Sequence, residues 1–235
     1  MKNPNPEKPV DTVLFDLDGT LTDPKAGITR CIRFALGHFE VEVPDADSLV
    51  WCIGPPLRAS FSTLLDTRDD RVLDQALSLY RKRFSEKGMY ENRVYPDVPA
   101  ALETLKSGGF GIFLATSKPR VFARKILDHF GLARFFKRIY GAELDGRLVD
   151  KGELIAHIIR SESLSRDTAL MVGDRRFDID GGKENGVMTA AVTYGYGSTD
   201  EIEAAEPDMI FHSLTDLAPF LTNSQGPGRP PLPHG

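Results

Sequence analysis

The stretch Thr12-Val13-Leu14-Phe15-Asp16-Leu17-Asp18-Gly19-Thr20 carries the fold prediction for this sequence. A short β-rich apolar run is followed at once by two aspartates and a glycine, as expected where a buried parallel strand ends in a loop. Strand geometry leaves one residue between Asp16 and Asp18, so the chain must bend to bring both toward one pocket. Gly19 can supply that bend. The alternative is an ordinary Asp-Gly turn with both aspartates in solvent.

Further apolar runs of strand length occur later in the chain, and helical patterns separate them. The runs lie at 111–115, 169–172, 189–192 and 209–211, and the helical patterns at 98–106, 121–130, 152–160 and 179–185. Strands that alternate with helices indicate a parallel sheet covered by helices on both faces. The sequence therefore predicts an α/β fold.

The segment from residue 26 to 92 breaks this alternation, because apolar residues recur through it at helical spacing and no convincing strand interrupts it. We therefore predict an all-helical domain inserted after the first strand. The predicted domains are an α/β core at 1–22 and 94–222, a helical domain at 23–93, and a Pro/Gly-rich tail at 223–235. The composition of that tail predicts disorder.

Composition and charge narrow the class of protein. With 235 residues, 41% of them hydrophobic and 27% charged, the chain has the balance of an ordinary globular protein with a full core. Its formal net charge of -5 argues against a protein that binds nucleic acid. The cysteines Cys31 and Cys52 are too few for a disulfide framework, and we expect reduced thiols. Neither a secretory signal nor a membrane-spanning run is recognisable, so we expect a cytoplasmic protein without a membrane partner, as a monomer or a homodimer.

The predicted strands end in residues that carry chemistry. The second strand ends in Thr116-Ser117-Lys118-Pro119 and the third in Gly173-Asp174-Arg175-Arg176-Phe177-Asp178. Because ligands of parallel sheets bind outside the carboxyl ends of the strands, we expect these side chains and the two first aspartates to converge at one edge. Gathered carboxylates repel each other unless a cation neutralises them, and oxygen ligands without His or Cys favour Mg²⁺. A carboxylate is also a nucleophile toward phosphorus, and a neighbouring one can transfer the proton.

These segments resemble the four ordered motifs of the haloacid dehalogenase (HAD) superfamily. They are Asp16-Leu17-Asp18-Gly19-Thr20, Thr116, Lys151 and Gly173-Asp174 through Asp178, and the resemblance covers about residues 10 to 220. The first and fourth motifs are specific, whereas the second and third are weak when taken alone. The resemblance implies a Rossmann-like core, and the helical insert looks like the helical type of cap domain. It places the chain near phosphoglycolate phosphatase-like members of the superfamily.

The resemblance implies a role for each matching residue. Asp16 would be the nucleophile and a metal ligand, and Asp18 the acid/base that also offers its backbone carbonyl to the metal. Asp174 would be the remaining protein ligand, and Asp178 would orient metal-bound water. Thr116 would hydrogen-bond the phosphoryl group, unless it is only a buried residue that closes a strand.

A lysine is needed to screen the phosphoryl charge between these carboxylates, and there are two candidates. Lys151 matches the third motif by its order, although it lacks the Pro-containing continuation of many relatives. Lys118 lies next to the second motif and could point into the same pocket. We favour Lys151, with Lys118 in support, against the alternative that Lys151 is an exposed lysine at a helix start.

Substrate choice is expected to come from the helical insert. The segment 51–58 is a Gly/Pro loop that leads into a helix. It is either a simple helix start, with Trp51 in the core of the insert, or a specificity loop. In the second case Arg58 would meet an anionic group of the substrate.

Asp18 narrows the reaction, because superfamily branches that cleave carbon–halogen or carbon–phosphorus bonds generally replace it. The predicted function is a Mg²⁺-dependent phosphatase that hydrolyses a small phosphorylated metabolite through an aspartyl-phosphate. Phosphoglycolate, a nucleoside 5'-monophosphate and an aryl phosphate such as phosphotyrosine all remain open as the substrate. The alternatives are a phosphomutase acting on a sugar phosphate and a non-catalytic binder of a phosphorylated ligand.

Overall fold

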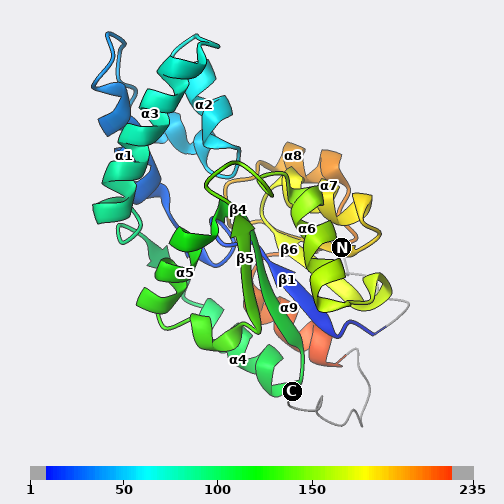
Figure 1. Ribbon diagram of the computed structural model, residues 1–235. Coiled ribbons are helices and arrows are strands. Elements are labelled where there is room, and N and C mark those ends of the chain that lie inside the picture. The colour runs from blue at the N-terminus through cyan, green and yellow to red at the C-terminus, as the bar shows by residue number, and fades with distance from the viewer. Residues whose placement is uncertain (1–8, 224–235) are drawn as a thin grey trace. The chain divides into compact units, whose positions relative to one another are not determined.

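The computed structural model describes residues 9–223, and the chain divides into two compact units (Figure 1). One unit combines the residues up to Leu21 with those from Val94 onward, and the other is Thr22–Arg93. The chain thus leaves the first unit after its first strand and returns to it after a single insertion. None of the helices in the described residues has the length and hydrophobicity that crossing a membrane requires.

The first unit contains a parallel sheet with the strand order β5-β4-β1-β6-β7-β8. Its strands are β1 (Thr12–Phe15), β4 (Gly111–Pro119), β5 (Arg138–Ala142), β6 (Ala169–Gly173), β7 (Met188–Val192) and β8 (Met209–Phe211). Its helices are α4 (Val98–Ser107), α5 (Arg120–His129), α6 (Lys151–Glu162), α7 (Arg176–Glu184), α8 (Thr199–Ala205) and α9 (Leu214–Asn223), with short 3₁₀ turns at Ala133–Phe135 and Arg166–Thr168. Helices α6 and α7 lie side by side, as do α4 and α9. The α/β prediction is confirmed.

Strand β1 occupies the centre of this sheet, and all of its residues are buried. Its last residue, Phe15, is in register with Leu114 of β4 and Val172 of β6. The backbone N–H of Asp16 continues the ladder and donates to the carbonyl of Val172 at 2.9 Å. The order of the strands reverses beside β1, and such a switch point is where open α/β sheets bind ligands. The register therefore brings the ends of β1, β4 and β6 to one place.

Helix α6 shows how the core fixes the start of an element. Its apolar residues Leu154, Ile155 and Ile158 are buried against the sheet residues Leu14 and Met171. The helix begins after Asp150, whose carboxylate accepts the backbone N–H of Glu153 at 2.9 Å. Such an N-cap satisfies an otherwise unpaired donor at the helix start. Lys151 is consequently held at the first position of α6.

The elements of the first unit differ from the prediction in three respects. Strand β5 was not predicted, because it is an edge strand with exposed and half-buried residues at its beginning rather than an apolar run. Helices α8 and α9 were missed as well. Helix α9 includes Thr222 and Asn223, so the predicted tail begins inside a helix, and residues 224–235 lie outside the described part of the chain.

The unit Thr22–Arg93 is built mainly from helices. They are α1 (Lys25–Leu36), the 3₁₀ helix η1 (Asp47–Cys52), α2 (Leu57–Leu64), α3 (Asp70–Arg83) and the π-helix η2 (Phe84–Gly88). The short strands β2 (Thr22–Asp23) and β3 (Arg93–Val94) pair with each other. The expected core position of Trp51 is wrong, because its side chain is 41% exposed on the short helix η1. Both cysteines are buried thiols that form no disulfide.

Candidate active site

The chain turns sharply after β1, and Gly19 is the residue that permits the turn. The backbone N–H groups of Thr20 and Leu21 both donate to the carbonyl of Leu17, at 3.3 and 2.9 Å. Gly19 has a φ of 86°, a region that other residues rarely adopt. A Cβ at this position would also overlap the carboxylate of Asp174. Gly19 is therefore required both by the turn and by the close approach of the end of β6.

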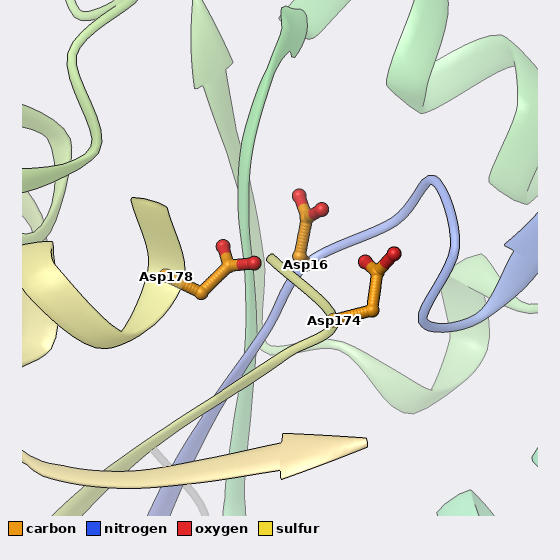
Figure 2. Close-up of side chains that lie close together, drawn as sticks. All are labelled: Asp16, Asp174 and Asp178. Carbon is orange, nitrogen blue, oxygen red and sulfur yellow. The ribbon is translucent and has the colours of Figure 1, made fainter. Parts of the chain in front are cut away.

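Three carboxylates converge at this edge of the sheet. Asp16 follows β1, Asp174 follows β6, and Asp178 lies in the first turn of α7 (Figure 2). They are 6%, 1% and 1% exposed, and one oxygen from each lies within 4.8 Å of the others. Such a cluster of buried, all-oxygen donors can hold a hard cation such as Mg²⁺.

Asp178 owes its position to the start of α7. Its Oδ2 accepts the backbone N–H of Arg175 at 3.2 Å, as an acidic residue in the first turn commonly does. A negative charge at this end is also favoured by the helix dipole. Gly173, the last residue of β6, leaves the space that the Asp178 side chain fills. The helix thus begins at Arg176, earlier than the predicted start at residue 179.

Lys151 is buried among these carboxylates. Its ammonium group donates to Asp16 Oδ1 at 3.0 Å and to the Ala115 carbonyl at 2.8 Å, and it forms an ion pair with Asp178 Oδ1 at 2.7 Å. Burial alone would lower the pKa of Lys151, but the charges of Asp16 and Asp178 outweigh it and raise the pKa. Lys151 is therefore a permanently charged, fixed cation. Its expected alternative, an exposed lysine at a helix start, does not hold at 5% exposure.

Lys118 reaches the same edge from the end of β4, where its ammonium group forms an ion pair with Asp18 Oδ2. Strand β4 runs on to Pro119, and the backbone N–H of Lys118 donates to the hydroxyl of Thr116 at 3.3 Å. Thr116 itself is buried. Burial raises the pKa of Asp18, and the neighbouring Lys118 opposes that rise. Both candidate lysines therefore lie among the aspartates.

The charges of the cluster do not balance without a further cation. When the four buried carboxylates of Asp16, Asp18, Asp174 and Asp178 are all ionised, they carry two more charges than Lys118 and Lys151 neutralise. Burial and then mutual repulsion raise the pKa of Asp174 well above its usual value. Burial, opposed by Lys151, raises the pKa of Asp178 to about 6. Asp18 Oδ1 is buried without a hydrogen-bond donor among the described residues. A divalent cation fits this donor set, because it would supply the missing positive charge.

Arg58 lies in the other unit, near the start of α2. Its guanidinium group donates to Asp70 Oδ1 and to Asp74 Oδ1, at 2.5 Å each, and these hydrogen bonds raise its pKa. The arginine is therefore already engaged by two carboxylates of α3. A role in substrate binding stays a prediction.

The contacts made by the loop after β7 were not predicted from the sequence. The backbone N–H of Tyr196 donates to Asp174 Oδ2 at 2.7 Å, and the hydroxyl of Tyr194 donates to the carbonyl of Thr20 at 2.7 Å. The available signal was the run Tyr194-Gly195-Tyr196-Gly197, which follows a predicted strand at the same edge of the sheet. The loop is therefore part of the site's surroundings.

Comparison with known proteins points to one family. A family model described as haloacid dehalogenase-like hydrolase matches residues 13–192. The chain is 47% identical over 206 residues to a 5'-nucleotidase of Pseudomonas aeruginosa, a match that covers 88% of this chain and 91% of that protein. It is also 34% identical over 211 residues to the tyrosine-protein kinase PtkA of Mycobacterium tuberculosis, covering 90% of this chain and 72% of that protein.

Solved structures agree with this result. The crystal structure of a predicted phosphatase from Clostridium acetobutylicum superposes with a TM-score of 0.88 at 40% sequence identity. The match covers 92% of this chain and 100% of the chain in that crystal structure. The similarity thus extends through both units of the chain and not only through the motifs.

Proposed function

This chain belongs to the haloacid dehalogenase-like hydrolase family, and we propose that it is a Mg²⁺-dependent phosphatase acting on small phosphate monoesters through an aspartyl-phosphate on Asp16. Membership confirms the predicted superfamily, and the named relatives support the predicted phosphatase class. The metal, the residue roles and the substrate belong to the proposal. The unit Thr22–Arg93 is proposed to be the cap domain that selects the substrate.

One observation carries this proposal. The carboxylate of Asp16, at the carboxyl end of the central strand, lies beside Asp174 and Asp178 while the fixed cation Lys151 donates to it. Buried like charges are costly, so a fold that gathers them needs a compensating cation. A phosphoryl group that enters such a site meets a nucleophile and positive charge together. Surface aspartates of an ordinary turn would not be arranged in this way.

We propose that Asp16, Asp174 and the backbone carbonyl of Asp18 hold the Mg²⁺ ion, with Asp178 as a neighbouring acceptor. The ion would supply charge neutralisation and polarise the phosphoryl oxygens. Lys151 keeps Asp16 in one orientation, because it is itself tied to the Ala115 carbonyl and to Asp178. The protein's own contribution is thus a nucleophile with little freedom to rotate.

In the first step, a carboxylate oxygen of Asp16 attacks phosphorus, and the bond from phosphorus to the ester oxygen breaks. Asp18 gives its proton to that oxygen, so an alcohol leaves. The raised pKa of Asp18 favours the protonated form that this step requires. Lys151 and the hydroxyl of Thr116 are proposed to stabilise the charge on the transferring phosphoryl group.

In the second step, Asp18 accepts a proton from water while the water oxygen attacks phosphorus. The bond between phosphorus and Asp16 breaks, which releases inorganic phosphate and restores the Asp16 carboxylate. Asp18 thus acts first as acid and then as base, and a single residue serves both half-reactions.

Nucleoside 5'-monophosphates are the first substrate class that we propose, because the relative with 47% identity is named a 5'-nucleotidase. Phosphotyrosine is a second candidate, since the relative PtkA is named a tyrosine-protein kinase. Both are phosphate monoesters, so the chemistry above serves either. The difference must come from groups that bind the leaving alcohol.

A panel of phosphate esters tests this proposal. Purified protein is assayed for phosphate release from nucleoside 5'-monophosphates, phosphotyrosine, phosphoglycolate and a hexose phosphate, with excess Mg²⁺ or excess EDTA. We expect release only with Mg²⁺ and the highest kcat/KM for a nucleotide. Turnover in EDTA would remove the metal from the mechanism. Isomerisation of the hexose phosphate without phosphate release would indicate a mutase, and metal binding without any turnover would indicate a non-catalytic binder.

A further inference from the structure

Each carboxylate oxygen of Asp174 has its own hydrogen-bond donor. The hydroxyl of Thr20 donates to Oδ1 at 3.0 Å, and the backbone N–H of Tyr196 donates to Oδ2 at 2.7 Å. Thr20 belongs to the turn after β1, and Tyr196 to the loop after β7. Because two donors from different elements hold one carboxylate, its rotation is restricted while lone pairs remain for a cation.

Three glycines press against the same residue. A Cβ on Gly19 or on Gly195 would overlap the carboxylate of Asp174, and a Cβ on Gly197 would overlap its backbone carbonyl oxygen. Gly195 and Gly197 do not have a positive φ, so their backbone conformation does not require glycine. Glycine is required there because the backbone passes so close to Asp174 that a Cβ would overlap it. The loop can lie against Asp174 only because these two positions lack side chains.

Tyr194 connects the loop after β7 to the turn after β1. Its hydroxyl donates to the carbonyl of Thr20 at 2.7 Å, and its ring packs edge-on against Tyr95 with 4.9 Å between the centroids. The side chain is therefore held at both its polar and its apolar end. The contacts form a closed path from Tyr194 to Thr20, from Thr20 to Asp174, and from Asp174 back to the loop at Tyr196.

We propose that the loop at residues 194–197 is a positioning element for Asp174, in which Tyr194 and Gly195 set the geometry of this metal ligand. The inference rests on the proposed function, because it takes Asp174 as a ligand of Mg²⁺. The hydroxyl of Tyr194 donates to the carbonyl of Thr20 and not to the carboxylate of Asp174, so Tyr194 acts through Thr20 and the loop backbone. Outer hydrogen-bond partners of metal ligands typically affect metal affinity by about 10- to 100-fold.

Metal affinity tests this role independently of turnover. Mg²⁺ binding is measured by calorimetry, and Mn²⁺ binding by the loss of the free-ion EPR signal, on the wild-type protein and on Tyr194→Phe and Gly195→Ala. We expect both variants to bind either ion about ten-fold more weakly or worse. Their kcat at saturating Mg²⁺ should return to within about three-fold of wild type, because a weakened ligand is compensated by more metal.

Two matched variants control for the loss of a hydroxyl and the gain of a methyl group. Tyr140→Phe removes a hydroxyl that donates to Glu162 in the same unit, and Gly37→Ala adds a Cβ whose nearest heavy atom lies 3.5 Å away. Neither should change metal affinity. Circular dichroism tests whether each variant is folded. If Gly195→Ala does not fold, the test rests on Tyr194→Phe alone.

The outcomes separate the two proposals. If wild type binds Mg²⁺ and Tyr194→Phe binds it equally well, the positioning role is wrong and the proposed function stands. If Tyr140→Phe weakens binding as much as Tyr194→Phe does, the effect is unspecific and the positioning role is again wrong. If wild type itself binds neither ion, the metal-dependent function fails, and the inference fails with it.

Discussion

The candidate functional charges of the two units lie in different surroundings. In the α/β unit, Asp16, Asp174 and Lys151 are buried at the end of the central strand. In the helical unit, Arg58 pairs with Asp70 and Asp74 at the surface. Exposed pairs contribute little to stability, whereas buried charges carry a large desolvation cost. Charges that remain buried in a fold despite this cost therefore indicate a functional site.

The largest effect should follow from changing the nucleophile. Asp16→Asn keeps the size of the side chain but removes its nucleophilic oxygen, so we expect kcat/KM to fall by at least about a thousand-fold. The metal-free melting temperature should stay near wild type, because the loss of the ion pair with Lys151 is offset by the loss of repulsion from Asp174 and Asp178. Initial rates with an aryl phosphate and a thermal melt measure both.

Asp180→Asn is the matched control for this change. Asp180 lies on the surface of α7 and pairs with Arg176, so its loss should leave the rate unchanged. Residual activity of Asp16→Asn above a few per cent would refute the assignment of the nucleophile, provided that the preparation is free of wild-type enzyme.

Within the α/β unit, the loss of Lys151 should lower kcat more than the loss of Lys118. Lys151→Met removes the cation that contacts Asp16, Asp178 and the Ala115 carbonyl, so we expect kcat to fall by about 10²- to 10³-fold. Without metal the protein should lose about 3 to 5 kcal/mol of stability, because buried carboxylates lose their partner. Added Mg²⁺ should restore part of that stability.

Steady-state rates and denaturant unfolding of Lys151→Met, Lys118→Met and Lys183→Met measure this ranking. Lys183 lies on α7, donates to the carbonyl of Ala205 at the end of α8, and serves as the control. A larger loss of kcat for Lys118→Met than for Lys151→Met would mean that Lys118 is the phosphoryl-binding lysine.

The structure explains why some of this site was predictable. Short apolar runs that end in acidic residues predicted β1 and β6, because a buried parallel strand must be apolar and its end meets the ligand side. Lys151 was predictable only by resemblance, since its neighbours Asp16 and Asp178 are far away in sequence. Pairing across such distances leaves no periodic signal in one sequence.

Other features had a weak signal in the sequence or none. The donor from Tyr196 to Asp174 is a backbone N–H, which every residue except proline possesses, so the sequence does not mark it. Strand β5 was missed because its residues are only partly buried at its start. Trp51 was expected in a core because large aromatic residues usually bury their area, yet a short 3₁₀ helix leaves it exposed.

A smaller effect on kcat is expected from changing Asn185, which contacts the start of α6 next to Lys151. The amide of Asn185, just after α7, donates to the carbonyls of Gly152 and Gly181 at 3.0 and 2.8 Å. Asn185→Ala leaves both buried carbonyls without this donor, which should cost about 1 to 3 kcal/mol. Because Gly152 follows Lys151, we also expect a modest loss of kcat with KM unchanged.

Denaturant unfolding and kinetics of Asn185→Ala check this, with Asn92→Ala as the control. Asn92 donates to the Thr22 hydroxyl at 3.3 Å in the helical unit. A loss of stability with no change in kcat would mean that Asn185 supports the fold and does not position Lys151.

The smallest effect is expected from Arg58, and it tests whether the surface pairs of the helical unit have a function. Because its guanidinium group is already held by Asp70 and Asp74, we expect Arg58→Ala to change KM for a nucleoside monophosphate by no more than about two-fold. Arg71→Ala, which removes a neighbouring exposed arginine paired with Asp69, is the control. A ten-fold or larger rise in KM at unchanged kcat, seen for Arg58→Ala alone, would indicate uniform binding of an anionic group by Arg58. The exposed charge of the helical unit would then bind the substrate, while the buried charges of the α/β unit carry out the reaction.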